Sequence, residues 1–157
     1  MNSRLSAFVL LFSLAFPATS ATVACPDLAG AVQVAACPSD EELRYTFTGY
    51  CSDNNRSYKG DTDVCTDFLA YRKLKNVALW ESADGNFNAY VSCDRASAEV
   101  RAAQPAAIRV GRQGGINLLV CGYGKGLNFT WRTRATCRID SVADCRDNPA
   151  ACKAECQ

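Results

Sequence analysis

Ten cysteines constrain the fold of this chain more than any other feature of its sequence. Their number is even, and the chain has neither a Cys-x-x-Cys pair nor a histidine, the usual components of a structural zinc site. We therefore expect structural disulfides, up to five of them, and neither a metal nor a cofactor. The cysteines are Cys25, Cys37, Cys51, Cys65, Cys93, Cys121, Cys137, Cys145, Cys152 and Cys156.

Residues 1–21 have the organisation of a secretory signal peptide. Arg4 precedes an apolar run, and Thr19 and Ala21 are the small residues of a cleavage site after Ala21. The run is shorter than the roughly 20 apolar residues that a membrane-spanning helix needs. We expect residues 22–157 to form a single disulfide-rich domain, secreted or periplasmic, with no membrane span.

The residues around the first cysteine support an alternative. Thr22 to Cys25 have the shape of a bacterial lipobox, with threonine where leucine is usual. Lipid on Cys25 would leave an odd number of cysteines, whereas secretion without lipid leaves an even number. Because an even number suits a closed disulfide set, we favour the protein without lipid and keep a lipoprotein as the alternative.

The clearest secondary-structure signal lies between Leu127 and Ile139, where apolar and polar residues alternate. Alternation with a period of two predicts one long strand with an apolar face and a basic face. The basic face carries Arg132, Arg134 and Arg138.

Two hairpins are predicted before this strand. Ala83–Asn86 contains an Asp-Gly pair, which favours a tight turn, and it joins strands at 77–82 and 87–93. Gly114-Gly115 joins strands at 107–112 and 116–123. The glycine-rich residues 122–126 lack the spacing of a phosphate-binding loop, so they predict a further turn.

Three other segments complete the prediction. Leu43–Cys51 alternates and predicts a strand. Thr62–Lys75 predicts a helix, acidic at its start and basic at its end, that docks on the sheet with Cys65 as a staple. Pro149 begins a short C-terminal helix with Cys152 and Cys156 on one face. The fold class is thus α+β and disulfide-rich: mainly antiparallel sheet, built from hairpins or a meander, with one packed helix and the C-terminal helix.

The charges are unevenly distributed along the chain. Residues 22–94 carry 6 basic and 11 acidic residues, whereas residues 95–139 carry 8 basic residues and a single acidic one, Glu99. This asymmetry suits a protein that attracts an anionic partner with one part of its surface. It suits equally a fold in which the two parts neutralise each other.

The absence of histidine excludes the Ser-His-Asp and Cys-His classes of catalytic site. A pair of carboxylates can still hydrolyse a glycosidic bond, and Glu81 and Asp84 lie close together near a predicted turn. Because turns collect acidic residues for solubility, we expect no catalytic residue and no enzymatic activity. A small carboxylate-dependent hydrolase remains an alternative function.

The leading hypothesis is a disulfide-braced binding module, with inhibition of another protein as one such role. Its candidate binding residues are Arg132, Arg134, Arg138, Tyr123 and Lys125. Arginine and aromatic side chains are enriched at interface hot spots. We expect the partner to be a protein or an anionic or glycan surface, not a nucleic acid. A structural envelope protein without a specific ligand is the third hypothesis.

Overall fold

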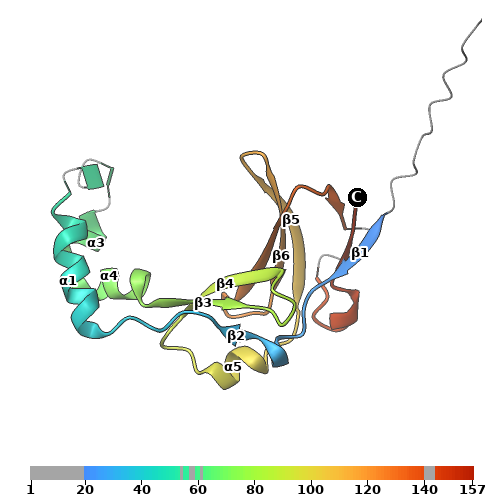
Figure 1. The fold of residues 1–157 in the computed structure, drawn as a ribbon, viewed down its shortest axis with the longest axis horizontal. Coiled ribbons are helices and arrows are strands. Elements are labelled where there is room, and N and C mark those ends of the chain that lie inside the picture. Colours follow the sequence, from blue (N-terminus) through green and yellow to red (C-terminus); the bar gives the residue numbers. More distant parts are fainter. Residues whose placement is uncertain (1–19, 54, 57–58, 61, 140–143) are drawn as a thin grey trace, which may run out of the picture.

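The computed structural model describes residues 20–157 apart from residues 54, 57–58, 61 and 140–143. Two antiparallel sheets lie side by side, and a lobe of helices projects from the end farther from the C-terminus (Figure 1). The α+β fold class with mainly antiparallel sheet is therefore confirmed. Most of the predicted signal peptide lies outside the described residues.

The larger sheet contains both predicted hairpins. Tight turns close them, with Gly85 at φ 72° and Gly114 at φ 59°, a conformation that glycine adopts without steric cost. The order across the sheet is β2-β3-β4-β7-β6-β5. These strands are β2 (Val32–Gln33), β3 (Val77–Glu81), β4 (Phe87–Ser92), β7 (Asn128–Thr133), β6 (Ile116–Gly122) and β5 (Ala107–Gln113).

The smaller sheet joins the two ends of the described chain. It consists of β1 (Ala21–Ala24), β9 (Lys153–Cys156) and β8 (Cys137–Arg138), in that order. A disulfide between Cys137 and Cys156 links β8 to β9.

The prediction of one continuous strand from Leu127 to Ile139 is wrong. β7 ends at Thr133, whose hydroxyl accepts a hydrogen bond from the backbone N–H of Ala135 at 3.0 Å. The carbonyl oxygen of Ala135 accepts a second bond from the Asn117 amide at 2.9 Å. These local bonds turn the chain away from the larger sheet, and β8 resumes in the smaller one.

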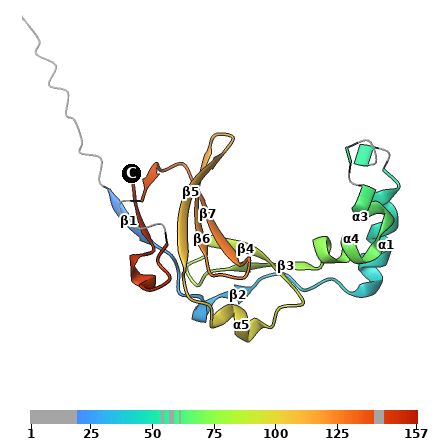
Figure 2. The same ribbon diagram turned by 180° about the vertical axis from the view of Figure 1, so that it is seen from behind.

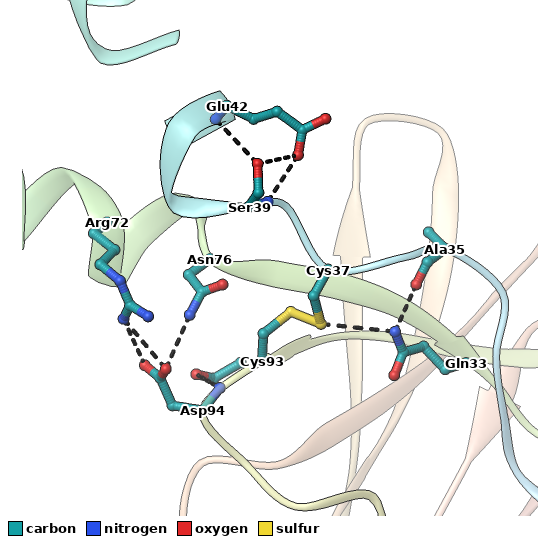
Figure 3. The surroundings of a disulfide bond; sticks show 10 residues. Gln33, Ala35, Cys37, Ser39, Glu42, Arg72, Asn76, Cys93 and Asp94 are labelled. Carbon is teal, nitrogen blue, oxygen red and sulfur yellow. Dashed lines mark hydrogen bonds and ion pairs between the residues drawn. A yellow bond between two sulfur atoms is a disulfide. The ribbon is translucent and has the colours of Figure 1, made fainter. Parts of the chain in front are cut away.

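The helical lobe contains α1 (Asp40–Cys51), α3 (Thr62–Thr66) and α4 (Phe68–Lys75). The prediction of a strand at 43–51 is wrong, because Ser39 starts a helix there. The Ser39 hydroxyl accepts from the Glu42 backbone N–H at 3.2 Å, and the Glu42 carboxylate accepts from the Ser39 backbone N–H at 2.7 Å (Figure 3). This reciprocal capping box satisfies backbone donors that would otherwise lack partners.

The predicted helix at 62–75 is divided between α3 and α4, and it packs on α1 instead of on the sheet. The ring of Phe47 lies 5.7 Å from that of Phe68 and 5.2 Å from that of Tyr71. Leu69 of α4 is 71% exposed. The helices thus form an aromatic core of their own.

A different helix packs on the main core. α5 (Ser97–Arg101) places the fully buried Val100 among the side chains on one face of the larger sheet. Leu28 of the short 3-10 helix η1 (Leu28–Gly30) is fully buried in the same core. α5 was not predicted from the sequence, because five residues are too few to show a helical period.

The lobe is tied to the sheet where the two meet. A disulfide joins Cys37, just before α1, to Cys93, just after β4. The carboxylate of Asp94 accepts hydrogen bonds from Arg72 at 3.2 Å and from the Asn76 amide at 3.0 Å (Figure 3). These contacts hold both the segment that enters the lobe before α1 and the segment that leaves it after α4.

Eight of the ten cysteines form four disulfides. Besides the two named above, Cys25 is joined to Cys121 and Cys145 to Cys152. Because Cys25 is in a disulfide, its sulfur is not available to carry a lipid in this structure. Cys51 and Cys65 are outside these four bonds.

The predicted C-terminal helix is a single 3-10 turn. Pro149 begins it as expected, and η2 (Pro149–Ala151) ends there because the chain passes directly into β9. Cys152 and Cys156 therefore do not share a helical face. No helix within the described ranges is long and apolar enough to cross a membrane.

Candidate functional site

The structure separates the five candidate binding residues into different surroundings. Tyr123 and Lys125 lie together at the turn between β6 and β7. Arg132 lies on β7, Arg134 in the bend that follows it, and Arg138 in the smaller sheet. The three arginines therefore do not form one row along a single strand.

Each of the three arginines is exposed. Arg132 donates a hydrogen bond to the side-chain oxygen of Asn88 on β4 at 2.9 Å. Arg138 lies opposite Glu155 of β9, whose carboxylate accepts hydrogen bonds from the hydroxyls of Ser20 and Thr22. The three side chains are solvated, and Arg138 lines a small hollow of about 210 Å³ with Ser20, Thr136, Glu155 and Gln157.

Tyr123 is buried rather than exposed. Its hydroxyl donates a hydrogen bond to the carbonyl oxygen of Pro26 at 2.6 Å, and its ring packs edge-on against Phe129 at 5.8 Å. Burial, and to a lesser extent the carboxylate of Asp27, raises the pKa of Tyr123 well above its ordinary value. Tyr123 therefore supports the site through buried contacts and is not an exposed binding residue.

The turn that carries Lys125 lines a groove of about 600 Å³, called the Lys125 groove below. One wall is α5 with the segment that follows it, another is the turn after β6, and Arg146 comes from the C-terminal segment. The groove is lined by Arg95, Glu99, Ala102, Ala103, Gln104, Pro105, Ala106, Tyr123, Gly124, Lys125 and Arg146.

Lys125 has an unusual backbone conformation. Its φ is 47°, and it is the only non-glycine residue with positive φ in the described part of the chain. Arg95 donates from its guanidinium to the Lys125 carbonyl oxygen at 2.7 Å, and the turn closes with a bond from Leu127 N–H to the Gly124 carbonyl at 3.0 Å. Strained backbone of this kind persists only where surrounding contacts hold it, and it is concentrated at functional sites.

The Lys125 groove has an excess of positive charge. Its lining includes three cationic side chains, those of Arg95, Lys125 and Arg146, and one carboxylate, that of Glu99. Glu99 lies 3.3 Å from the Lys125 ammonium and 3.6 Å from the Arg95 guanidinium. The Lys125 side chain is nevertheless 81% exposed, and that of Arg146, which pairs with the Asp144 carboxylate at 3.1 Å, is 75% exposed, so both can reach an incoming anion.

Disulfides brace two walls of the Lys125 groove. Cys121, two residues before Tyr123, is joined to Cys25. Cys145, directly before Arg146, is joined to Cys152. Because these bonds hold the backbone on both sides, the groove exists before a ligand binds and little ordering is required on binding.

Of the two carboxylates considered for hydrolysis, that of Asp84 holds the hairpin turn together. Asp84 accepts hydrogen bonds from the Ser82 hydroxyl and from Asn86. The bond from Ser82 is the largest of the causes that lower the pKa of Asp84. A general acid requires the opposite shift. Glu81 lies in β3, opposite Asn88. Within the described residues, no group of three or more metal-ligating side chains could hold a metal ion.

Arg95, Glu99 and Arg146 were not predicted as site residues from the sequence. No local motif marks them, because they come from segments far apart in the chain and meet only after folding. The one local signal is the glycine-rich turn at 122–126. Comparison with protein-family models, curated proteins and solved structures finds no match to this chain.

Proposed function

We propose that this protein is a secreted or periplasmic binding module that recognises an anionic group of a protein or glycan in the Lys125 groove. The observation that carries the proposal is the strained, exposed Lys125, held by Arg95 above a buried Tyr123. Disulfides on two sides and an excess of cationic side chains support it. Inhibition of another protein is one role that such a rigid surface could serve.

Placement outside the cytoplasm rests on two observations. Four disulfides require an oxidising compartment to form and persist. The residues before Thr22 have the pattern of a cleaved signal peptide. We expect mass analysis of the protein purified from its native host to show Thr22 as the first residue.

The test compares two pairs of substitutions that remove the same charge from different places. Lys125→Asn with Arg146→Gln changes the Lys125 groove, and asparagine tolerates the positive φ at position 125. Arg132→Gln with Arg134→Gln is the matched control on the surface outside the groove. Binding to heparin and to polyglutamate is measured for the mature protein and both variants.

We expect the groove pair to weaken binding roughly a hundredfold, about tenfold for each charge-assisted hydrogen bond to the ligand that it removes. The control pair should have little effect. Preference for heparin would indicate a sulfated glycan as the partner, and preference for polyglutamate an acidic protein. Equal weakening by both pairs would mean that only overall charge matters. Either that result or no binding of any anionic probe would refute the proposal.

A further inference from the structure

The outer edge of β5 is the margin of the larger sheet (Figure 2). β5 is seven residues long, and its hairpin partner β6 pairs on its other side with β7. Pairing between β6 and β7 ends at Asn117 and Thr133, so the tip of the β5–β6 hairpin extends past β7. The edge is therefore long and projects from the sheet.

The pairing pattern shows which backbone groups of β5 face outward. Tyr123 N–H donates to the Leu127 carbonyl at 2.9 Å, so the odd-numbered residues of β6 bond toward β7 and the even-numbered ones toward β5. Through the register, the even-numbered residues of β6 lie opposite the odd-numbered residues of β5. Val110 and Arg112 thus direct their N–H and C=O groups away from the sheet.

These outward groups have no hydrogen-bond partner among the described residues. The first part of the same edge is already covered by the chain itself: Asp144 forms an antiparallel bridge with Ala107, and Cys145 N–H donates to the Ala106 carbonyl at 3.0 Å. The edge can therefore accept an antiparallel segment.

The side chains along the edge are basic and apolar. Arg109 and Arg112 are exposed on opposite faces of the strand, and Val110 between them is 40% exposed. Two copies pairing through β5 would bring four arginines into one short ladder, which disfavours a homodimer. An acidic strand would meet complementary charge at both positions.

We propose that the outer edge of β5 binds an acidic, extended segment of a partner protein as an additional antiparallel strand. The outward groups of Val110 and Arg112 supply the ladder hydrogen bonds, as in other cases of strand addition. Antiparallel register places one acid opposite Arg112, an apolar residue opposite Val110 and a second acid opposite Arg109. The segment recognised therefore has the pattern acid-x-apolar-acid.

The proposal does not depend on the Lys125 groove. The test uses the mature protein with a probe peptide of sequence Thr-Glu-Thr-Val-Glu-Thr. One comparison peptide has lysine for both glutamates, and another has the same composition with the glutamates adjacent. Dissociation constants are measured by calorimetry, and amide chemical shifts of β5 report the position of binding.

Three sets of variants make the test specific. Val110→Pro removes an outward N–H while leaving the bonds between β5 and β6, because proline is tolerated on the open side of an edge strand. Val110→Ala is its matched control, since it keeps the N–H. Arg109→Glu with Arg112→Glu reverses the charge of the edge, and the Lys125→Asn, Arg146→Gln pair tests independence from the groove.

We expect the glutamate peptide to bind about tenfold or more tightly than either comparison peptide. We expect Val110→Pro to weaken binding of the glutamate peptide about fivefold or more. Val110→Ala and the Lys125→Asn, Arg146→Gln pair should bind this peptide about as tightly as the unchanged protein does. The charge-reversed protein should prefer the lysine peptide, a gain that loss of folding cannot produce. Equal binding of all peptides, or no binding, would overturn the proposal, as would a dimer of the free protein that Val110→Pro dissociates.

Discussion

The hydroxyl of Tyr123 donates a hydrogen bond to the carbonyl oxygen of Pro26 across 2.6 Å, although the two residues are 97 positions apart in the sequence. The disulfide between Cys25 and Cys121 lies beside this bond in the chain. Together they hold the N-terminal segment against β6 and beneath the Lys125 groove. The groove is thus supported by residues that a ligand does not contact.

The first prediction concerns the Tyr123 hydroxyl. Tyr123→Phe keeps the ring but removes the donor to Pro26, so we expect the free energy of unfolding to fall by about 1 kcal/mol. Urea denaturation measures the change. Tyr90→Phe is the control, because Tyr90 is 73% exposed and its hydroxyl should contribute almost nothing. Equal effects of the two substitutions would contradict the structural role of Tyr123.

The second prediction is a loss of stability at alkaline pH. The pKa of Tyr123 is raised above its ordinary value of 10.0, chiefly by burial and secondarily by Asp27. A raised pKa in the folded state means that the stabilisation is complete below about pH 10 and is lost as the pH rises above it. We expect the free energy of unfolding to decline from pH 10 upward, and to decline less in Tyr123→Phe. An identical decline in both proteins would exclude Tyr123 as its cause.

The third prediction ranks two disulfides. Cys25–Cys121 spans 96 positions, whereas Cys145–Cys152 spans 7. On the chain-entropy model, removing the first should cost about 4.7 kcal/mol and removing the second about 2.3 kcal/mol. Each pair is replaced by serine and unfolding is followed in urea. If removing Cys145–Cys152 lowers the free energy of unfolding more than removing Cys25–Cys121, the disulfides stabilise the protein mainly through the native state and not by restricting the unfolded chain.

The hairpins could be predicted because their signals are local. Asp84-Gly85 and Gly114-Gly115 adopt turns that few other residue pairs allow, and alternation marks the strands on either side. Buried Phe87 and Phe129 show which face of the sheet packs into the core. The fold class followed from these elements.

The errors arose where two periods compete. Residues 43–51 fit alternation, yet Leu43 and Phe47 are also four apart, as on one face of a helix. Ser39 and Glu42 decide the outcome, because a capping box favours a helix start before any packing is formed. Residues 134–136 interrupt alternation through hydrogen bonds that the sequence pattern does not reveal.

The candidate site was only partly predictable. Lys125 stood out because glycines surround it, but its partners Arg95 and Arg146 belong to distant segments. Contacts of this kind depend on how α5 and the C-terminal segment pack against the sheet. A single sequence carries no periodic signal for such packing.

The last prediction concerns the two cysteines outside the four disulfides. The Cys51 thiol lies 3.9 Å from the carbonyl oxygen of Val64, the residue before Cys65, and α1 packs against α3. We expect the protein from an oxidising host to carry a fifth disulfide between Cys51 and Cys65. Closing a loop of about 15 residues, this bond would stabilise the helical lobe by about 3 kcal/mol.

Peptide mapping without reduction checks this prediction: a cross-linked fragment containing both cysteines supports it. Cys51→Ser with Cys65→Ser should then lower the stability of the lobe while leaving the sheet intact, because α1 and α4 share an aromatic core separate from the sheet and α3 packs against both helices. Hydrogen exchange resolves the two parts of the molecule. Recovery of Cys51 and Cys65 as alkylated thiols would show that the lobe is held by its aromatic packing and by Cys37–Cys93 without a staple of its own.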